Sequence, residues 1–340
     1  MVKILVVGPS WIGDTLLAQP LFRLLHNTHD DAAVDVLSPQ WTLPLLARMP
    51  EVRRSILNPF GHGELRLGAR RALGIQLRDE SYDRAIVLPN TLKSALVPYF
   101  AGIPLRTGFR GELRWGLLND VRRLDEHATP RLAQRYAALA GPPGAAPMPL
   151  PEVRLRVDES IRRATLARLG LEAAPRAAAL CPGAEYGPAK RWPVTHFAEL
   201  AKSLAAKGYA VWLVGSAKDR ELGETIVELS GRACRNLCGK TSLDDAVDVL
   251  ASSEVVVSND SGLMHVAAAL GKRLVALYGS STPDYTPPLS GNATTLWLGL
   301  SCSPCFRREC PLGHFNCMMQ LTPERVCSAI EFDKIGRDTR

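Results

Sequence analysis

The sequence predicts an α/β fold of two Rossmann-like domains, each built on a mostly parallel sheet. Short apolar runs that end at glycine or a small polar residue alternate with helical periodicity, as in βαβ units. This alternation occurs twice, on either side of a proline-rich segment at residues 141–151. The 340 residues are about twice the ~150 of a typical domain. We therefore expect domains at 1–150 and 151–340, with their sheets facing a central cleft.

The first half opens with a strand that is apolar almost throughout. Lys3–Val7 is a β-rich run that ends at Gly8, as expected for a strand buried on both faces of a parallel sheet. Leucines at helical spacing predict a helix from about Asp14 to Asn27. Further short strands are predicted at Val34–Leu37 and Ala85–Leu88.

Segment 141–151 contains five prolines in eleven residues. Proline cannot continue a helix or a central strand, so we expect a semi-rigid linker there. Beyond the linker we predict one helix and four strands: helix Thr195–Lys207 and strands Ala177–Cys181, Ala210–Val214, Val255–Ser258 and Leu274–Tyr278. We also expect the last helix of the chain to pack back on the first domain.

The composition is that of a globular protein, with 46% hydrophobic and 22% charged residues, which excludes disordered and fibrous classes. The net charge of +7 suggests a nucleotide, a nucleic acid or an acidic membrane surface as partner, or simply serves solubility. The first apolar run is too short for a signal peptide, and no segment reaches the ~18 apolar residues of a membrane span. We therefore expect a cytoplasmic protein that is at most peripheral to a membrane.

Five of the eight cysteines lie in the last 40 residues. This uneven placement in a long chain argues against a secreted disulfide scaffold. Four of the five, with His314 nearby, have partly zinc-like spacing: Cys302, Cys305, Cys310 and Cys317. A structural zinc site, a reduced thiol cluster and a labile disulfide all remain open interpretations, and none of them is catalytic.

The loop after the first strand carries a candidate acid or base. Gly8–Asp14 lacks the G-x-G-x-x-G spacing of dinucleotide sites and the G-K-[ST] of a P-loop. It places Asp14 at a helix start, where a carboxylate either stabilises the helix or serves as general base for a hydroxyl.

Loops after strands of the second half carry a phosphate-binding pattern. Pro182–Pro193 has two glycines followed by Lys190 and Arg191, which form either a phosphate site or a solvated surface. Asp260 follows the strand that ends at Ser258, and His265 lies one turn into a small-residue helix. That histidine is either structural or functional. The small-residue loop 279–283 follows the next strand.

These motifs together closely resemble those of the family 9 glycosyltransferases, over nearly the whole chain. The shared motifs are Gly-x-x-Gly-Asp, Lys-Arg-Trp-Pro, Asn-Asp-Ser-Gly-x-x-His-x-Ala-Ala-Ala-Leu-Gly and Leu-Tyr-Gly-x-Ser. The resemblance implies a GT-B fold, with an acceptor-binding first domain and a donor-binding second domain. It implies inverting transfer of L-glycero-D-manno-heptose from ADP-heptose to the first heptose of the lipopolysaccharide inner core.

The resemblance also implies roles for individual residues. Asp14 would be the base that deprotonates the acceptor hydroxyl, and Lys190 would neutralise the donor diphosphate. Asp260 would face the donor heptose. The other donor contacts implied are Gly13, Ser261, Gly262 and His265, with Asp219 at the ribose and Thr241 near the adenine.

One departure concerns the diphosphate. Where related enzymes carry two threonines, the loop Pro182–Pro193 has Glu185 and Tyr186. These two residues stay candidates for donor contact, but the phosphates would depend more on Lys190 and on backbone N–H groups.

The expected chemistry needs neither cofactor nor catalytic metal. The sequence contains no Asp-x-Asp motif, and a cationic side chain with helix N-termini can stabilise a leaving phosphate. The expected partners are ADP-heptose, a heptosylated Kdo-lipid A acceptor and the inner-leaflet membrane surface. The dispersed basic residues and the lack of a recognition motif argue against nucleic acid.

A rival interpretation is another GT-B enzyme, either a heptosyltransferase with a different acceptor or a sugar-nucleotide 2-epimerase. The epimerase would turn over its sugar nucleotide without any acceptor. Under the first interpretation, arginines of the first half would suit a phosphorylated, anionic lipid acceptor. They are Arg106, Arg110, Arg114, Arg122 and Arg123.

Overall fold

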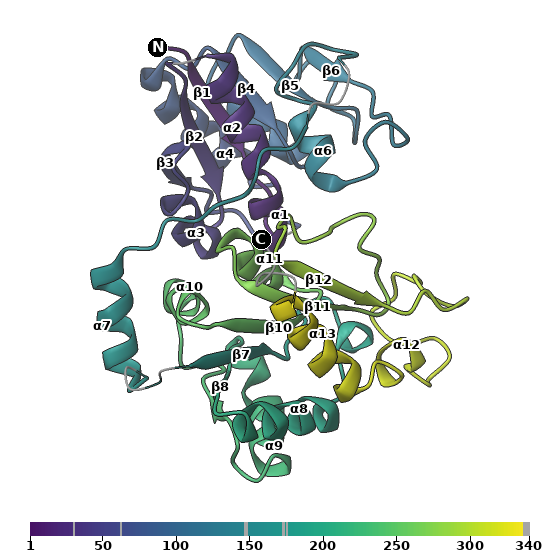
Figure 1. The fold of residues 1–340 in the computed structure, drawn as a ribbon. Helices are drawn as coiled ribbons and strands as arrows, with labels where there is room; N and C mark the ends of the chain where they lie inside the picture. The colour runs from purple at the N-terminus through teal and green to yellow at the C-terminus, as the bar shows by residue number, and fades with distance from the viewer. Residues whose placement is uncertain (30, 62, 146–148, 172–173, 175, 336–340) are drawn as a thin grey trace. The chain divides into compact units, whose positions relative to one another are not determined.

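The computed structural model describes residues 1–29, 31–61, 63–145, 149–171, 174 and 176–335 (Figure 1). The chain divides into two compact units, Met1–Val153 and Arg154–Arg340. Residues 146–148 of the predicted linker lie outside the described residues, and the described part of segment 141–151 contains neither helix nor strand.

The first unit is built on a six-stranded sheet of order β3-β2-β1-β4-β5-β6, in which all neighbours run parallel. Its strands are β1 (Lys3–Val7), β2 (Ala33–Ser38), β3 (Val52–Leu57), β4 (Arg84–Val87), β5 (Leu105–Phe109) and β6 (Asp120–Arg122). Its helices are α1 (Ile12–Leu17), α2 (Gln19–Thr28), α3 (Leu43–Ala47), α4 (Leu67–Gln76), α5 (Leu96–Phe100) and α6 (Leu132–Ala137), with short 3-10 turns η1 (Gln40–Thr42), η2 (Leu77–Glu80) and η3 (Leu92–Ala95).

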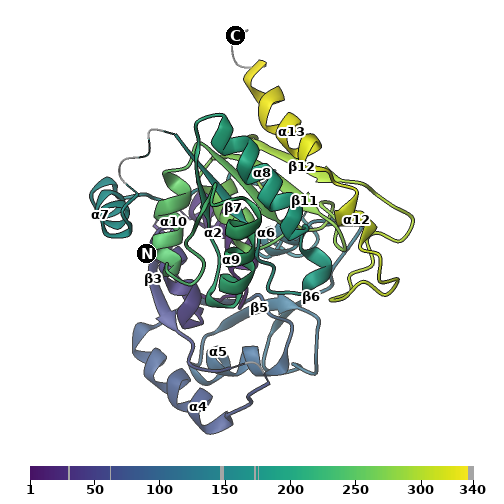
Figure 2. The same ribbon diagram turned by 90° about the horizontal axis from the view of Figure 1, so that it is seen from below.

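Helices cover both faces of this sheet. Helix α2 packs with α6, and α4 packs with α5. Figure 2 shows the two pairs on opposite sides of the sheet. Apolar side chains of β1 and β4 fill the space beneath α5, and Leu5, Val87 and Val97 belong to one buried cluster. The unit is therefore doubly wound, as the alternation of strands and helices predicts.

The second unit repeats this plan with the parallel order β12-β11-β10-β7-β8-β9. Its strands are β7 (Ala177–Cys181), β8 (Ala210–Leu213), β9 (Arg235–Asn236), β10 (Val255–Asn259), β11 (Arg273–Tyr278) and β12 (Ala293–Trp297). Its helices are α7 (Glu159–Leu169), α8 (Val194–Ala206), α9 (Arg220–Leu229), α10 (Leu243–Ala251), α11 (Gly262–Ala269), α12 (Asn316–Met319) and α13 (Pro323–Ile335), with 3-10 turns η4 (Pro188–Lys190) and η5 (Ala217–Asp219).

Helices α8 and α9 pack together on one face of the second sheet, while α10 packs with α7 and α11 on the other (Figure 1). Helix α13 contacts α8 and β11 of its own unit. The core of this unit centres on Trp192 and Phe197, whose rings meet edge to face with centroids 4.8 Å apart. None of the described helices combines the length and the hydropathy that crossing a membrane requires.

The predicted helix over 14–27 is two helices in the structure. Helix α1 begins earlier, at Ile12, and ends at Leu17; α2 then begins at Gln19. Pro20 lies in the first turn of α2. Proline fits there because its missing N–H would have no partner within the helix.

Candidate functional site

The loop between β7 and α8 is held in place by one buried tryptophan. Trp192 is 1% exposed, and its indole Nε1 donates a 2.7 Å hydrogen bond to the carbonyl of Leu321. The backbone N–H of Trp192 donates to Asn259 Oδ1 at 3.0 Å, and Asn259 Nδ2 donates to the carbonyl of Pro182 at 2.8 Å. Both ends of the loop are thereby tied to the end of β10, which fixes where Lys190 lies.

Lys190 and Asp260 form an ion pair at the carboxyl end of the sheet. Lys190 Nζ lies 2.5 Å from Asp260 Oδ2, and the Asp260 side chain is only 5% exposed. The hydroxyl of Ser281, in the loop after β11, donates to the same oxygen. Because β10 lies between β7 and β11, the loops after all three strands meet here. The structure therefore brings together two residues predicted for the site and adds Ser281.

Helix α11 begins directly after this ion pair. Ser261 precedes the helix, Gly262 is its first residue, and Ser261 Oγ lies 3.3 Å from Ser258 Oγ. The N–H groups of a first helical turn have no acceptor within the helix and carry partial positive charge. Together with the Lys190 ammonium, they form a setting in which a diphosphate can bind.

His265 lies beneath the ion pair, buried in α11. Burial lowers the pKa of this imidazole to about 4; the Lys190 charge acts in the same direction, and the Asp260 charge opposes both. The ring is therefore neutral at neutral pH and adds no positive charge beside Lys190.

This depressed pKa makes stability depend on pH. Between pH 7 and 5 the unfolded chain takes up a proton on His265, with an ordinary pKa near 6.5, while the folded chain does not. The free energy of unfolding should therefore fall by about 2 kcal/mol from this residue over that range. In urea titrations at both pH values, His265→Gln should lose this component. For the control His127→Gln, at an exposed position, the free energy of unfolding should fall between pH 7 and 5 by as much as that of the wild type. An equally large fall for His265→Gln would contradict the assignment.

Asp219 and Thr241 lie on adjacent loops after β8 and β9. Asp219 Oδ2 accepts hydrogen bonds from the backbone N–H and the hydroxyl of Ser216, at 2.9 and 2.7 Å. A Cβ at Gly183 would lie 2.4 Å from this oxygen, so only glycine lets the β7 loop approach. The Thr241 loop is joined to the Asp219 loop because the Gly239 N–H donates to the carbonyl of Gly215 at 3.1 Å.

Glu185 and Tyr186 have partners of their own. Glu185 forms an exposed ion pair with Lys218. The Tyr186 hydroxyl donates a 2.8 Å hydrogen bond to the carbonyl of Phe306. Lys190 Nζ lies 5.3 Å from the centroid of the Tyr186 ring, and Arg308 Cζ lies 5.4 Å from it. Tyr186 thus connects Lys190 to the cysteine-rich segment, residues 302–317.

That segment braces the Lys190 loop, a role that sequence reasoning missed. The Ala189 N–H donates to the carbonyl of Arg308 at 3.0 Å, and the Phe306 N–H donates to the carbonyl of Ser280 at 2.7 Å. A Cβ at Gly187 would lie 2.5 Å from the Arg308 carbonyl oxygen. Ser281 could have been predicted as a site residue from the sequence, because it lies in the small-residue loop 279–283, directly after a strand.

Four cysteines of this segment line one pocket. They are Cys302, Cys305, Cys310 and Cys317, all free thiols. His314 and Ser280 share the pocket, and the Ser280 hydroxyl is buried with no hydrogen-bond partner in the described part of the chain. Among the described residues, no three His, Cys, Asp or Glu side chains are grouped to hold a metal ion. The four thiols thus line one pocket, and the zinc, thiol-cluster and disulfide interpretations of them stay predictions.

The thiols of this cluster should differ in reactivity. Backbone hydrogen bonds, the strongest from Phe315, lower the pKa of Cys310, whereas burial raises the pKa of Cys317. Since the thiolate is the nucleophile, iodoacetamide at pH 7.5 should modify Cys310 before Cys317, as followed by peptide mass spectrometry. Buried Cys181 should react only after denaturation. Faster labelling of Cys317 than of Cys310 would refute the ordering.

Asp14 lies at the carboxyl end of β1, half-buried in the first turn of α1. Trp11, not Asp14, is the N-cap, and buried Gly13 immediately precedes the aspartate. A carboxylate in a first turn is stabilised by the positive end of the helix. The position thus puts a carboxylate at the edge of the sheet where ligands of parallel sheets bind.

The arginines expected to meet an anionic lipid divide into two groups. Arg106 donates to the carbonyls of Leu117 and Ile103, and Arg122 is buried in an ion pair with Asp120 at 2.8 Å. These two arginines are structural, so the expectation is wrong for them. Arg110 and Arg123 are exposed, and Arg114 is buried.

Comparisons with known proteins agree with this arrangement. Residues 70–316 match the model of glycosyltransferase family 9 (heptosyltransferase). The chain is 50% identical over 334 residues to lipopolysaccharide heptosyltransferase 2 of Escherichia coli (strain K12), covering 95% of this chain and 96% of that protein. It is 48% identical over 308 residues to lipooligosaccharide heptosyltransferase 2 of Haemophilus influenzae, covering 87% and 88% of the two chains.

The fold is also shared with a solved structure. The structure of E. coli ADP-heptose lps heptosyltransferase II superposes with a TM-score of 0.89 at 47% identity, covering 99% of this chain and 100% of that one. This likeness confirms the predicted GT-B class and its two Rossmann-like domains. The chain therefore belongs to glycosyltransferase family 9, the heptosyltransferases.

Proposed function

We propose that this glycosyltransferase moves L-glycero-D-manno-heptose from ADP-heptose to the first heptose of the lipopolysaccharide inner core, with inversion at the anomeric carbon. The observation that carries the donor side is the Lys190–Asp260 ion pair directly before α11. The high identity to proteins named lipopolysaccharide and lipooligosaccharide heptosyltransferase 2 supports the choice of acceptor class.

On the donor side, the diphosphate would lie against the Lys190 ammonium and the first N–H groups of α11, at Ser261 and Gly262. A diphosphate takes up part of the Lys190 charge, which leaves Asp260 able to accept hydrogen bonds from heptose hydroxyls. The Ser281 hydroxyl keeps that carboxylate oriented. Neutral His265 fills the space beneath without adding charge.

The remaining donor contacts follow from the loops beside this site. Asp219, in the turn after β8, is the proposed partner of the ribose hydroxyls, and Thr241, on the adjacent loop, of the adenine. Tyr186 would act through Lys190, whose ammonium faces its ring. Glu185 and Gly13 are further proposed contacts of the donor.

In the proposed reaction, Asp14 takes the proton of the acceptor hydroxyl as its oxygen attacks the anomeric carbon of the heptose. The bond from that carbon to the oxygen of the β-phosphate breaks, and its electrons leave with ADP. One displacement from the opposite face inverts the configuration. The negative charge that develops on ADP is stabilised by Lys190 and by the helix N–H groups. No cofactor or metal enters this scheme.

The proposed acceptor is heptosylated Kdo-lipid A, in which Kdo is an acidic sugar. Because this acceptor is a lipid, we place the enzyme at the cytoplasmic face of the inner membrane as a peripheral protein.

The test measures ADP release by the purified chain in EDTA-containing buffer. Three reactions are compared, with ADP-heptose plus mono-heptosylated acceptor, plus a heptose-free core, and without acceptor. Release with the first acceptor alone, giving a product of inverted anomeric configuration by NMR, is the expected result. Turnover without acceptor would favour the epimerase interpretation, and turnover with the heptose-free core would indicate a different acceptor.

A further inference from the structure

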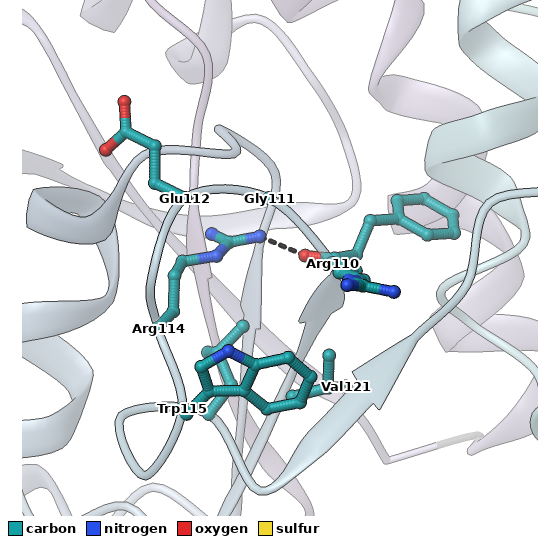
Figure 3. Close-up of a pocket in the computed structure, with 8 residues that line it drawn as sticks. Arg110, Gly111, Glu112, Arg114, Trp115 and Val121 are labelled. Atoms are coloured by element: carbon teal, nitrogen blue, oxygen red, sulfur yellow. Dashed lines mark hydrogen bonds between the residues drawn. The ribbon is translucent and has the colours of Figure 1, made fainter.

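A small pocket in the first unit lies at the carboxyl end of β5. Its wall includes Phe109, Arg110, Arg114, Trp115, Leu118 and Val121 (Figure 3). The pocket thus combines two guanidinium groups with an apolar lining, and the proposed reaction does not use it.

Arg114 carries a buried charge that lacks a counter-ion. The residue is 3% exposed, and its Nη atoms donate to the carbonyls of Pro89 and Phe109 and to the side chain of Asn90. Its Nε has no hydrogen-bond partner, and the guanidinium forms no ion pair, within the described residues. Burial lowers the pKa of this group, with Glu112 acting against it. Buried charges are costly unless they are paired, so the pocket favours an anion.

The pocket is lined by one carboxylate, Glu112, which is engaged with the backbone rather than with an arginine. Glu112 Oε2 accepts a 2.7 Å hydrogen bond from the backbone N–H of Leu92, at the start of η3. Figure 3 shows this side chain pointing away from Arg110 and Trp115. The loop after β5 can lie directly against the loop after β4 because residue 111 is a glycine. A Cβ at Gly111 would be 2.3 Å from the carbonyl oxygen of Asn90. The loop is therefore anchored with two guanidinium groups and a single carboxylate, which is held by a backbone N–H.

Arg110 and Trp115 form the accessible side of the pocket. Trp115 is 65% exposed, and Arg110 Cζ lies 5.8 Å from the centroid of its ring. An exposed indole offers an apolar face on which the C–H groups of a sugar ring can pack. The planar guanidinium of Arg110 matches the two oxygens of a carboxylate. The pair suits a ligand that is both a sugar and an acid.

The pocket also lies on the sheet edge that carries Asp14. Strands β1, β4 and β5 are neighbours in the sheet, and the Asp14 loop follows β1. Of the residues that hold Arg114, Pro89 follows β4 and Phe109 ends β5. Ligands of open parallel sheets bind outside the carboxyl ends of the strands, so one acceptor can reach both places.

We infer that this pocket is an acceptor subsite that binds the carboxylate of the sugar acid adjoining the accepting heptose. Arg110 contacts the carboxylate, Trp115 packs against the sugar ring, and Arg114 supplies a buried positive charge behind them. The inference rests on the proposed function, because that function supplies the acidic sugar.

The first test uses the exposed Arg110→Gln, with the exposed Arg71→Gln on α4 as control for the lost charge. Arg110→Gln should raise KM for the heptosylated acceptor about 10- to 100-fold, as expected for a charge-assisted hydrogen bond. Its kcat and its KM for ADP-heptose should stay near wild type. Arg71→Gln should change none of these. Equal effects of the two variants would overturn the inference.

The second test changes the acceptor. With the Kdo carboxylate reduced to an alcohol, the wild type should acquire the raised KM of Arg110→Gln, and the variant should lose nothing more. If both enzymes lose the same factor, Arg110 does not bind this carboxylate. If the variant's defect instead follows removal of the lipid A phosphates, the subsite binds phosphate and the inference fails.

A binding measurement separates the subsite from the proposed reaction. Saturation-transfer NMR with free Kdo should give a signal with the wild type and with Arg71→Gln, and little with Arg110→Gln. Equal signals from all three would refute the subsite even if transfer occurs. A selective loss would support it even if the assay of ADP release were to reject the proposed acceptor.

Discussion

Asp14→Asn should lower kcat by about 10²- to 10⁴-fold, the usual contribution of a general base. The amide keeps the size and hydrogen-bonding shape of the side chain but cannot take a proton from the acceptor hydroxyl. Because the base acts mainly in the transition state, KM for ADP-heptose should stay within about twofold of the wild type. Steady-state kinetics with the heptosylated acceptor measure both parameters.

The control for this variant is a carboxylate in a similar local position. Asp79 lies in the first turn of η2 and is exposed, so Asp79→Asn should alter neither kcat nor KM. Loss of the favourable interaction with the helix N-terminus should cost Asp14→Asn at most about 1 kcal/mol of stability, which a urea titration checks. An Asp14→Asn enzyme with wild-type kcat would exclude this residue as the base.

Lys190→Ala should lower kcat by about 10²- to 10³-fold and also weaken donor binding, since the charge on departing ADP loses its cationic partner. The same change leaves the Asp260 carboxylate buried without its ion-pair partner, which is 19% exposed. Breaking a largely buried pair from one side should cost about 3 kcal/mol of stability. Turnover and urea denaturation are therefore measured together.

A double variant separates these two effects. Lys190→Ala/Asp260→Asn removes the orphaned charge, so most of the lost stability should return while kcat stays low. Lys202→Ala on the exposed face of α8 controls for loss of one positive charge and should match the wild type. If the double variant recovered turnover as well as stability, Lys190 would serve the fold rather than the diphosphate.

Strands at the centre of each sheet were the most predictable elements. β1 and β7 match their predicted bounds to the residue, because both are apolar runs buried on each side by helices. Edge strands were missed. β3 is Val-Arg-Arg-Ser-Ile-Leu with several exposed side chains, and β12 is half-buried throughout. One-sided packing leaves such strands polar enough to look like loops.

Some contacts of the candidate site could likewise be predicted from the sequence, and others could not. Lys190 and Asp260 could be placed together from the sequence, because each follows a parallel strand and such strands end at one edge. The contacts of Tyr186 with Phe306 and of Trp192 with Leu321 could not, since they join residues more than 100 positions apart. Likewise, the five arginines look alike in sequence, and only the fold shows that Arg106 is bonded to backbone carbonyls and Arg122 to Asp120 while Arg110 is exposed.

The hydrogen bonds that hold the Lys190 loop have a consequence for how the chain folds while it is being synthesised. This loop takes its hydrogen-bond partners from Phe306, Arg308 and Leu321, near the end of the chain. Domains fold as units while the chain is being made, the N-terminal one first. The first unit holds its own sheet and core and can fold early, whereas the Lys190 loop, already tied to Asn259, completes its contacts only once residue 321 has left the ribosome. A nascent chain therefore completes the unit that carries Asp14 well before the loop that carries Lys190 is fully held in place.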